Sequence, residues 1–271
     1  MRQLSGVCVW MVAVVLAPLA AGGPPNSGRW RYFTPILSST SRSLRPVEAD
    51  SILGGFCQTP VHLVHGVGLS CSTRRLGPGF SDIVDHEFHP KGAIFGHFLG
   101  PESDDALIGG WSAETHPYRW GGTLLLSRRG GAWIPMWYRS ALIIDSCEKI
   151  ALPDRREMLL CEDEDSGMGH SLHYLYAVDL EHPSDLEHSL LAKAETFRDD
   201  CVSQKQVLKG FHWRPDRQGF SVVVDTIEWR RLSTGPYCGD YPKERPTSLR
   251  LAFAVASQGL RKVEAEPEPR R

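Results

Sequence analysis

The hydrophobic residues of this chain gather in short runs that are separated by turn-forming residues. Strongly apolar runs lie at about 93–99, 158–161 and 220–224, and a proline, a charged residue and a polar turn precede each of them. A second apolar run comes later in each segment, beginning near Gly122, His173 and Arg250. Short apolar runs bounded by turns are typical of β-strands. The pattern therefore predicts an all-β protein made of antiparallel strands.

The three segments repeat at a nearly constant interval. Their prolines are Pro90, Pro153 and Pro215, which are 63 and 62 residues apart. Repeats of this length indicate propellers or arrays. Runs such as "TLLL" and "FSVVV" show no polar alternation, as expected of strands that are buried on both faces in stacked blades or inside a sandwich. We therefore predict a propeller-like repeat of about four units, in which the first unit matches the others poorly.

The second segment resembles the TolB-type β-propeller repeat. That repeat has Pro-Asp-Gly, a short apolar strand, a polar hairpin and an aromatic-rich strand that ends in Asp. Pro153-Asp154, the run at 158–161 and the stretch 174–179 match this order, and Arg155 stands where the family has glycine. The third segment matches over about 213–226. The resemblance implies a propeller-like fold and brings no catalytic residue with it.

One helix is expected between the repeats. The stretch "SDLEHSLLAKAETFRDD" begins with Ser184 and has Glu187 three residues later, which is the pattern of a capping box. Leu186, Leu190 and Phe197 fall on one face at helical spacing. We predict an inserted helix near 185–199.

The two ends of the chain indicate export and disorder. A basic start, an apolar run at 7–19 and small residues up to Gly22 predict a signal peptide at 1–22, although an uncleaved anchor is the alternative. The apolar run is short for a bilayer span, so no stable span is expected after cleavage. We predict a linker at 23–50, one β-repeat domain at 51–263 and a disordered tail at 264–271. The expected location is secreted or periplasmic.

Export changes the interpretation of the cysteines, because an oxidising compartment favours disulfides. Besides Cys8 in the leader, the chain has six cysteines: Cys57, Cys71, Cys147, Cys161, Cys201 and Cys238. Cys147 and Cys161 are symmetric about Asp154, so a hairpin that turns there would place them opposite each other and predicts that they pair. Cys57–Cys71 has the same separation without a turn at its midpoint, and Cys201–Cys238 follows by elimination.

Composition and motifs narrow the functional classes. Thirty Lys and Arg nearly balance 32 Asp and Glu, without a basic stripe, which argues against nucleic-acid binding. The chain has no GxSxG, no glycine-rich phosphate loop and no HExxH. These absences favour a non-catalytic protein without identifying its activity.

The stretch from Gly110 to Gly122 is the richest candidate site. It combines aromatic rings with hydrogen-bonding groups, a mixture that suits sugar or peptide binding. The candidate ligand-binding residues are Trp111, Glu114, His116, Tyr118 and Trp120. The alternative is that its tryptophans only fill the packing between repeats.

The acidic stretch "CEDEDSGMGHSLH", from Cys161 to His173, is expected to be a hairpin loop whose charges face water. Asp163, Asp165 and His170 are the candidate metal ligands. No cofactor is expected if the loop is only solvated. The alternatives are calcium, which clustered carboxylates bind, and a zinc or copper site that uses His170 and His173 with Glu162 or His116.

The sequence thus predicts an exported, non-catalytic, propeller-like domain that binds a protein or a glycan. The alternatives are an extracytoplasmic polysaccharide hydrolase that uses Glu114, His116 or Asp163, and a metal-stabilised binding module.

Overall fold

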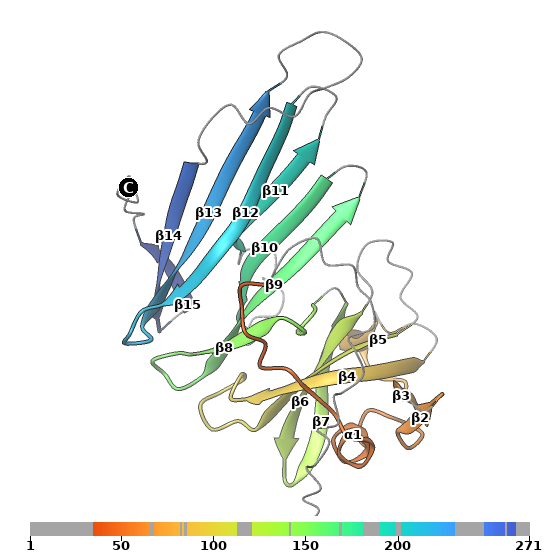
Figure 1. Cartoon of the computed structure of the whole chain (residues 1–271). Helices are drawn as coiled ribbons and strands as arrows, with labels where there is room; N and C mark the ends of the chain where they lie inside the picture. The colour runs from red at the N-terminus through yellow and green to blue at the C-terminus, as the bar shows by residue number, and fades with distance from the viewer. Residues whose placement is uncertain are drawn as a thin grey trace, which may run out of the picture. The chain divides into compact units, whose positions relative to one another are not determined.

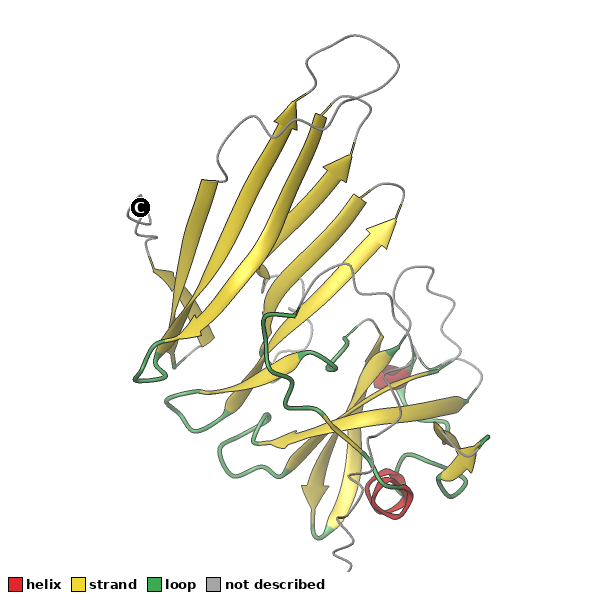
Figure 2. Cartoon of the chain, viewed as in Figure 1, coloured by secondary structure: helices red, strands yellow, loops and turns green. Residues whose placement is uncertain are grey.

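The computed structural model describes residues 35–65, 68–81, 83, 86–112, 121–140, 142–167, 170–180, 190–198, 202–230, 247–257 and 259–263. Strands account for 62% of the structure, and they are antiparallel throughout the named sheets (Figure 2). The predicted all-β class is therefore confirmed. The predicted signal peptide, residues 23–34 of the predicted linker, and the predicted tail at 264–271 lie outside the described residues.

The first sheet has seven strands in the order β2-β3-β4-β5-β6-β7, and β1 pairs with β4 (Figure 1). Its elements are β1 (Arg42–Ser43), α1 (Pro46–Leu53), β2 (His62–Val64), β3 (Gly68–Ser72), the 3₁₀ turn Pro78–Phe80, β4 (Glu87–Gly96), β5 (Asp105–Trp111), β6 (Gly122–Arg129) and β7 (Ala132–Ser140). Apolar residues of α1 and of these strands form one buried cluster, in which Phe56, Phe88 and Tyr138 are the largest side chains.

The helix α1 follows local rules that the sequence analysis did not use. Pro46 is at the start of the helix and Glu48 is in its first turn, both favourable at a helix N-terminus. Ala49, Ile52 and Leu53 have helical spacing and are buried in the cluster of the first sheet. The fold thus includes β1 and α1, which lie within the stretch 23–50 predicted to be a linker or reach into it.

The second sheet has eight strands that pair strictly in chain order, from β8 to β15. The strands are β8 (Cys147–Ala151), β9 (Glu157–Gly167), β10 (His170–Val178), β11 (Leu190–Arg198), β12 (Val202–Trp213), β13 (Gly219–Arg230), β14 (Thr247–Ala256) and β15 (Gly259–Val263). Trp213 Nε1 at the end of β12 donates to Glu148 Oε1 on β8, at 3.1 Å. Because three strands separate β8 from β12 in the sheet, this contact shows that the sheet curls around its apolar face, where Leu160, Leu175 and Phe220 are buried.

Two of the three predicted repeats share the same turn. In the turns at 152–156 and 214–218, an arginine at positive φ (Arg155 at 70°, Arg217 at 57°) donates its N–H to the carbonyl three residues earlier. In each turn the aspartate Oδ1 accepts the N–H two residues on, at 3.0 Å. Pro90, by contrast, lies inside β4 beside a bulge. The described strands form two meandering sheets and do not close a propeller of four units.

The predicted helix near 185–199 is wrong over Leu190–Arg198, which is the strand β11. Residues 181–189, which include the predicted capping box, lie outside the described residues. Ala192 and Ala194 are buried and Lys193 between them is exposed, so burial follows the two-residue period of a strand. Pairing of β11 with β10 overrides the local helical preference of "LLAKAE".

Residues 35–44, which we call the N-terminal arm, contact both sheets (Figure 1, red to orange). Leu37 is buried in the cluster of the second sheet, and Thr40 N donates to Cys147 O on β8 at 2.8 Å. Further along, Arg42 and Ser43 pair with β4, and Leu44 enters the cluster of the first sheet. A Cβ at Gly92 would lie 2.6 Å from Ser41 Oγ and 3.3 Å from Arg42 O, so glycine at this position leaves room for the arm to pass close to β4.

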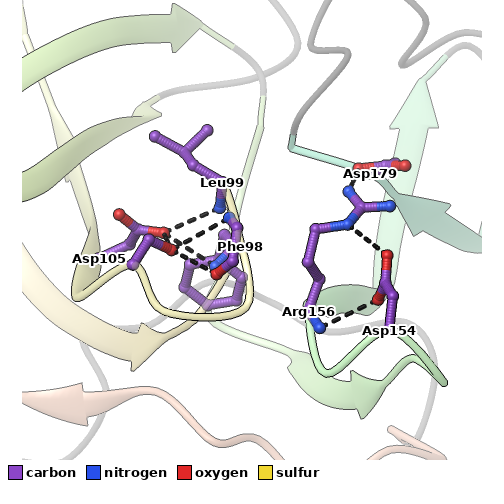
Figure 3. A network of polar contacts seen from close by, with 8 residues as sticks. Phe98, Leu99, Asp105, Asp154, Arg156 and Asp179 are labelled. Carbon is purple, nitrogen blue, oxygen red and sulfur yellow. Dashed lines mark hydrogen bonds and ion pairs between the residues drawn. The ribbon is translucent and has the colours of Figure 1, made fainter.

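Two carboxylate networks hold the ends of hairpins (Figure 3). Asp105 Oδ2 accepts the N–H groups of Phe98 and Leu99, both at 2.8 Å, which closes the β4–β5 connection. Arg156 bonds Asp154 within its own turn and Asp179 after β10. These networks account for polar groups that would otherwise be unpaired near the core.

A third network lies on the second sheet. Asp225 on β13 accepts a hydrogen bond from Ser248 Oγ at 2.6 Å and an ion pair from Lys209 Nζ at 2.9 Å. Burial by itself would raise the pKa of Asp225, but the hydrogen bonds from Ser248 and Lys209 and the charge of Lys209 hold that pKa below its ordinary value.

Candidate ligand-binding site

Trp111 is at the last position of β5, directly opposite His89 on β4. Alternate residues of β5 share a face, and Leu107 on this face is completely buried whereas Trp111 is 38% exposed. The Trp111 and His89 rings stack with their centroids 3.7 Å apart and their planes at 12°. The strand pairing therefore presents an indole ring at the surface and supports one of its faces with an imidazole.

Glu87 and Ser70 extend this polar edge. Glu87 lies two residues before His89 on β4, so both side chains share the face of Trp111. Ser70 Oγ on β3 donates to Glu87 Oε1 at 2.9 Å, and His89 Nε2 lies 3.4 Å from the same oxygen. The Glu87 side chain is 52% exposed, so its carboxylate borders solvent beside the stacked rings.

The order of these contacts does not suit nucleophilic catalysis. In a catalytic triad the histidine contacts the nucleophile and the acid orients the histidine. Here Glu87 lies between Ser70 and His89, and Ser70 is buried with 1% exposure. The arrangement can accept hydrogen bonds and offer an aromatic surface, which are the properties of a binding site.

Glycines surround the Trp111 side of the site. Gly110 pairs with Gly122, and this is the last pair of the β5–β6 ladder, directly before Trp111. A Cβ at Gly110 would collide with the Phe88 ring at 2.5 Å, and Gly121, just before β6, has φ +115° with Gly110 O 2.6 Å from its would-be Cβ. Backbone packing thus requires glycine at Gly110 and Gly121.

Of the residues predicted to bind a ligand, the structure describes Trp111. Glu114, His116, Tyr118 and Trp120 lie outside the described residues, in the segment that joins β5 to β6 in the sequence. Sequence analysis missed Glu87 and His89. Their spacing, Glu-x-His at the start of an apolar strand, puts both on one face, but only the pairing of β4 with β5 brings them to Trp111.

The acidic stretch after Cys161 is not the loop that was predicted. Residues 157–167 form β9, which pairs with β10 from Leu159↔Val178 to Gly167↔His170. Glu162 and Asp163 are buried rather than solvated. The expectation failed because successive residues of a strand face opposite sides, so four acids in a row do not share one environment.

Glu162 contacts residues of the N-terminal arm and of β10. Its carboxylate accepts the N–H groups of Ile36 and Leu37 at 2.9–3.0 Å and contacts Nε2 of buried His173 on β10. The carboxylate therefore holds the N-terminal arm on the second sheet. Charge-assisted bonds of this type are the strong class of hydrogen bonds in proteins.

The predicted metal ligands lie along the same two strands. Asp163 pairs with Tyr174 and Asp165 with Leu172 across β9 and β10, and His170 starts β10. Asp163 Oδ1 accepts the N–H of Glu164 at 2.9 Å. Within the described part of the chain, no group of three or more His, Cys, Asp or Glu side chains is placed to hold a metal ion.

Two predicted disulfides are present. Cys147 and Cys161 are direct partners in the β8–β9 ladder and are bonded, as the symmetry about Asp154 predicted. Cys57 and Cys71 are also bonded, whereas Cys201 and Cys238 lie outside the described residues. The two bonds indicate an oxidising, extracytoplasmic environment. Over the residues that the structure describes, no helix is long and apolar enough to cross a membrane.

Searches against protein-family models, curated proteins and solved structures find no match to this chain.

Proposed function

We propose that this protein is an exported, non-catalytic binding module that recognises a glycan through Trp111. The observation that carries the proposal is the exposed indole of Trp111, one face of which is supported by the stacked ring of His89. Sugar rings present C–H faces to aromatic rings, so an exposed indole that is held in place fits a pyranose.

The surface favours a small ligand over a protein partner. A stable protein interface buries about 800 Å² on each side and has an apolar centre. The other exposed large hydrophobic side chains are spread over separate elements of the described chain: Val47 in α1, Leu63 in β2, Ile134 in β7, Leu190 in β11, Leu249 in β14 and Val263 in β15.

Export rests on the predicted signal peptide at 1–22 and on the two disulfides. N-terminal sequencing of the protein recovered from the culture medium or periplasm tests it, and the expected mature start is near Gly23. The resemblance to the TolB-type repeat, over residues 150–182 and 213–226, stays a prediction, and no part of the functional proposal depends on it.

The experiment is a glycan array followed by calorimetry on the mature chain and on Trp111→Ala. We expect the substitution to weaken glycan binding at least tenfold, which corresponds to about 1.4 kcal/mol. Ile134→Ala is the matched control, because Ile134 is 40% exposed on the same sheet and lies away from His89. Unchanged affinity in Trp111→Ala, with the fold intact by circular dichroism, would disprove the proposal.

A further inference from the structure

We propose that His89 is a positioning residue of the Trp111 site: its ring closes one face of the indole and fixes it, so that a sugar stacks on the opposite face alone. Glu87 and Ser70 then act on binding only through His89. This inference rests on the proposed glycan-binding function. It adds to that function the face of Trp111 that takes the ligand and the residues that set the affinity without touching the ligand.

The imidazole of His89 covers the side of Trp111 that is turned toward β4. The two residues are partners in the β4–β5 ladder, so their side chains leave the sheet on the same face. Their rings lie nearly parallel, with planes at 12° and centroids 3.7 Å apart, which is van der Waals contact and leaves no space for a sugar between them. A ligand therefore has to approach the indole from the side away from His89.

Trp111 depends on this contact for its position. It is the last residue of β5, and the β5–β6 ladder ends one residue earlier, at the pair Gly110↔Gly122. Among the rings that the structure describes, the imidazole of His89 is the one that stacks on the indole. An indole that rotates freely has to be ordered when a ligand binds, and this ordering weakens the affinity. An indole that is already held binds the same ligand more tightly.

His89 is held in turn by contacts that lead into the core. Its side chain is 15% exposed, and its Nε2 lies 3.4 Å from Glu87 Oε1, an oxygen that also accepts a hydrogen bond from Ser70 Oγ at 2.9 Å. Ser70 is 1% exposed, so this end of the chain of contacts is buried. The order Ser70, Glu87, His89, Trp111 runs across β3, β4 and β5. The first three residues affect the indole without reaching its free face.

Two substitutions separate the ring of His89 from its nitrogen. Stacking on the indole needs only a flat aromatic ring. The contact with Glu87 needs the nitrogen. His89→Phe therefore keeps the contact with Trp111 and loses the contact with Glu87, whereas His89→Ala loses both.

The test measures the binding of glucose and N-acetylglucosamine hexamers by calorimetry, on variants whose fold is confirmed by circular dichroism. His89→Ala should weaken binding by about fivefold, the cost of ordering one side chain, and His89→Phe should stay within about twofold of the wild type. Glu87→Ala should weaken binding about threefold in the wild-type background and leave it unchanged in the His89→Phe background, as a double-mutant cycle requires when one residue acts through the other. His62→Ala is the matched control, because His62 is an exposed histidine of β2 in the same sheet.

A second measurement needs no ligand. In the chain labelled with 5-fluorotryptophan, the fluorine resonance of Trp111 is assigned with Trp111→Phe. In His89→Ala this resonance should move toward that of the free amino acid, because the indole loses its stacked neighbour. In His89→Phe it should stay dispersed. An unchanged resonance in His89→Ala would overturn the positioning role whether or not a glycan binds.

The outcomes separate the two proposals. If His89→Ala binds as the wild type does, or if His89→Phe binds as weakly as His89→Ala, the positioning inference is overturned and the glycan site at Trp111 stands. An equal effect of Glu87→Ala in both backgrounds would overturn the claim that Glu87 acts through His89. If neither hexamer binds to the folded wild-type chain, or if Trp111→Ala binds as the wild type does, both proposals fail.

Discussion

Replacing Glu162 by alanine should release the N-terminal arm and destabilise the whole fold. Glu162 is 7% exposed, its two oxygens accept the N–H groups of Ile36 and Leu37, and it contacts His173, which is 2% exposed on β10. Alanine would remove every one of these acceptors. It would also leave the two amides without this acceptor in a site that water scarcely reaches.

The magnitude follows from the hydrogen bonds that are lost. A hydrogen bond to a charged group contributes about 1.5–3 kcal/mol, and Glu162 binds two separate amides. We therefore expect Glu162→Ala to lower the free energy of unfolding by about 4 kcal/mol, a large part of the 5–15 kcal/mol of a typical domain. Glu162→Gln keeps one acceptor oxygen and should cost about half as much.

Urea unfolding and amide hydrogen exchange are the assays. The control is Glu164→Ala, because Glu164 is the next residue of β9 on the same face and is only partly buried. It should change the free energy of unfolding by less than about 0.5 kcal/mol. In Glu162→Ala, exchange of the Ile36 and Leu37 amides should rise well beyond the change in global stability. If Glu162→Ala costs no more than Glu164→Ala, or if the two amides stay as protected as in the wild type, the proposed anchoring of the arm is wrong.

Three further predictions follow from the turns and networks of the second sheet. Replacing Cys147 and Cys161 together by serine should lower the free energy of unfolding by about 3 kcal/mol, the chain-entropy estimate for a loop of this size, and should lower the melting temperature. Equal melting temperatures of the wild type and the double variant under non-reducing conditions would contradict this. Arg155→Gly and Arg217→Gly should each raise the free energy of unfolding by about 0.5 kcal/mol. Glycine relieves the strain of a positive φ (70° or 57°), and this gain exceeds the cost of the extra freedom that glycine gives the unfolded chain. A loss of stability in both variants would refute the turn geometry. Asp225→Asn should be less stable than the wild type at neutral pH. The pKa of Asp225 is lower in the folded state than in the unfolded state, so its ionised carboxylate stabilises the fold fully above the unfolded-state pKa near 4, and this stabilisation is lost as the pH falls through the folded-state pKa. The free energies of unfolding of the wild type and of Asp225→Asn should therefore converge in acid. A constant difference between them at all pH values would count against the network.

The sequence predicted those features whose causes are local. The pairing of Cys147 with Cys161 follows from the turn at Pro153-Asp154, and both partners lie within one hairpin. The strand class follows from apolar runs that need no knowledge of their neighbours.

The features that the sequence did not predict depend on distant partners. The stretch Leu190–Arg198 has helical preferences, but pairing with β10 decides its conformation. In the sequence alone, Glu162 belongs to an acidic stretch that is expected to be solvated. Its true environment depends on Ile36, 126 residues away, whose N–H donates to its carboxylate. Likewise, Trp111 could be chosen from its neighbours in the sequence, whereas His89 and Glu87 reach it only through the register of β4 and β5.

The N-terminal arm has a consequence for the order in which the chain can fold. Ile36 and Leu37 leave the ribosome, or the export channel, at the beginning of the process, yet their acceptor Glu162 follows 125 or more residues later. A vectorial process can pair β2 to β7 as each strand emerges, since those neighbours are adjacent in the chain. The arm has to wait until β9 and β10 are in place, with the apolar side chain of Leu37 uncovered in the meantime. The arm can therefore dock only after the second sheet has been synthesised. A chain that is arrested before β9 would have an undocked N-terminal arm with exposed apolar side chains, which chaperones and proteases can recognise.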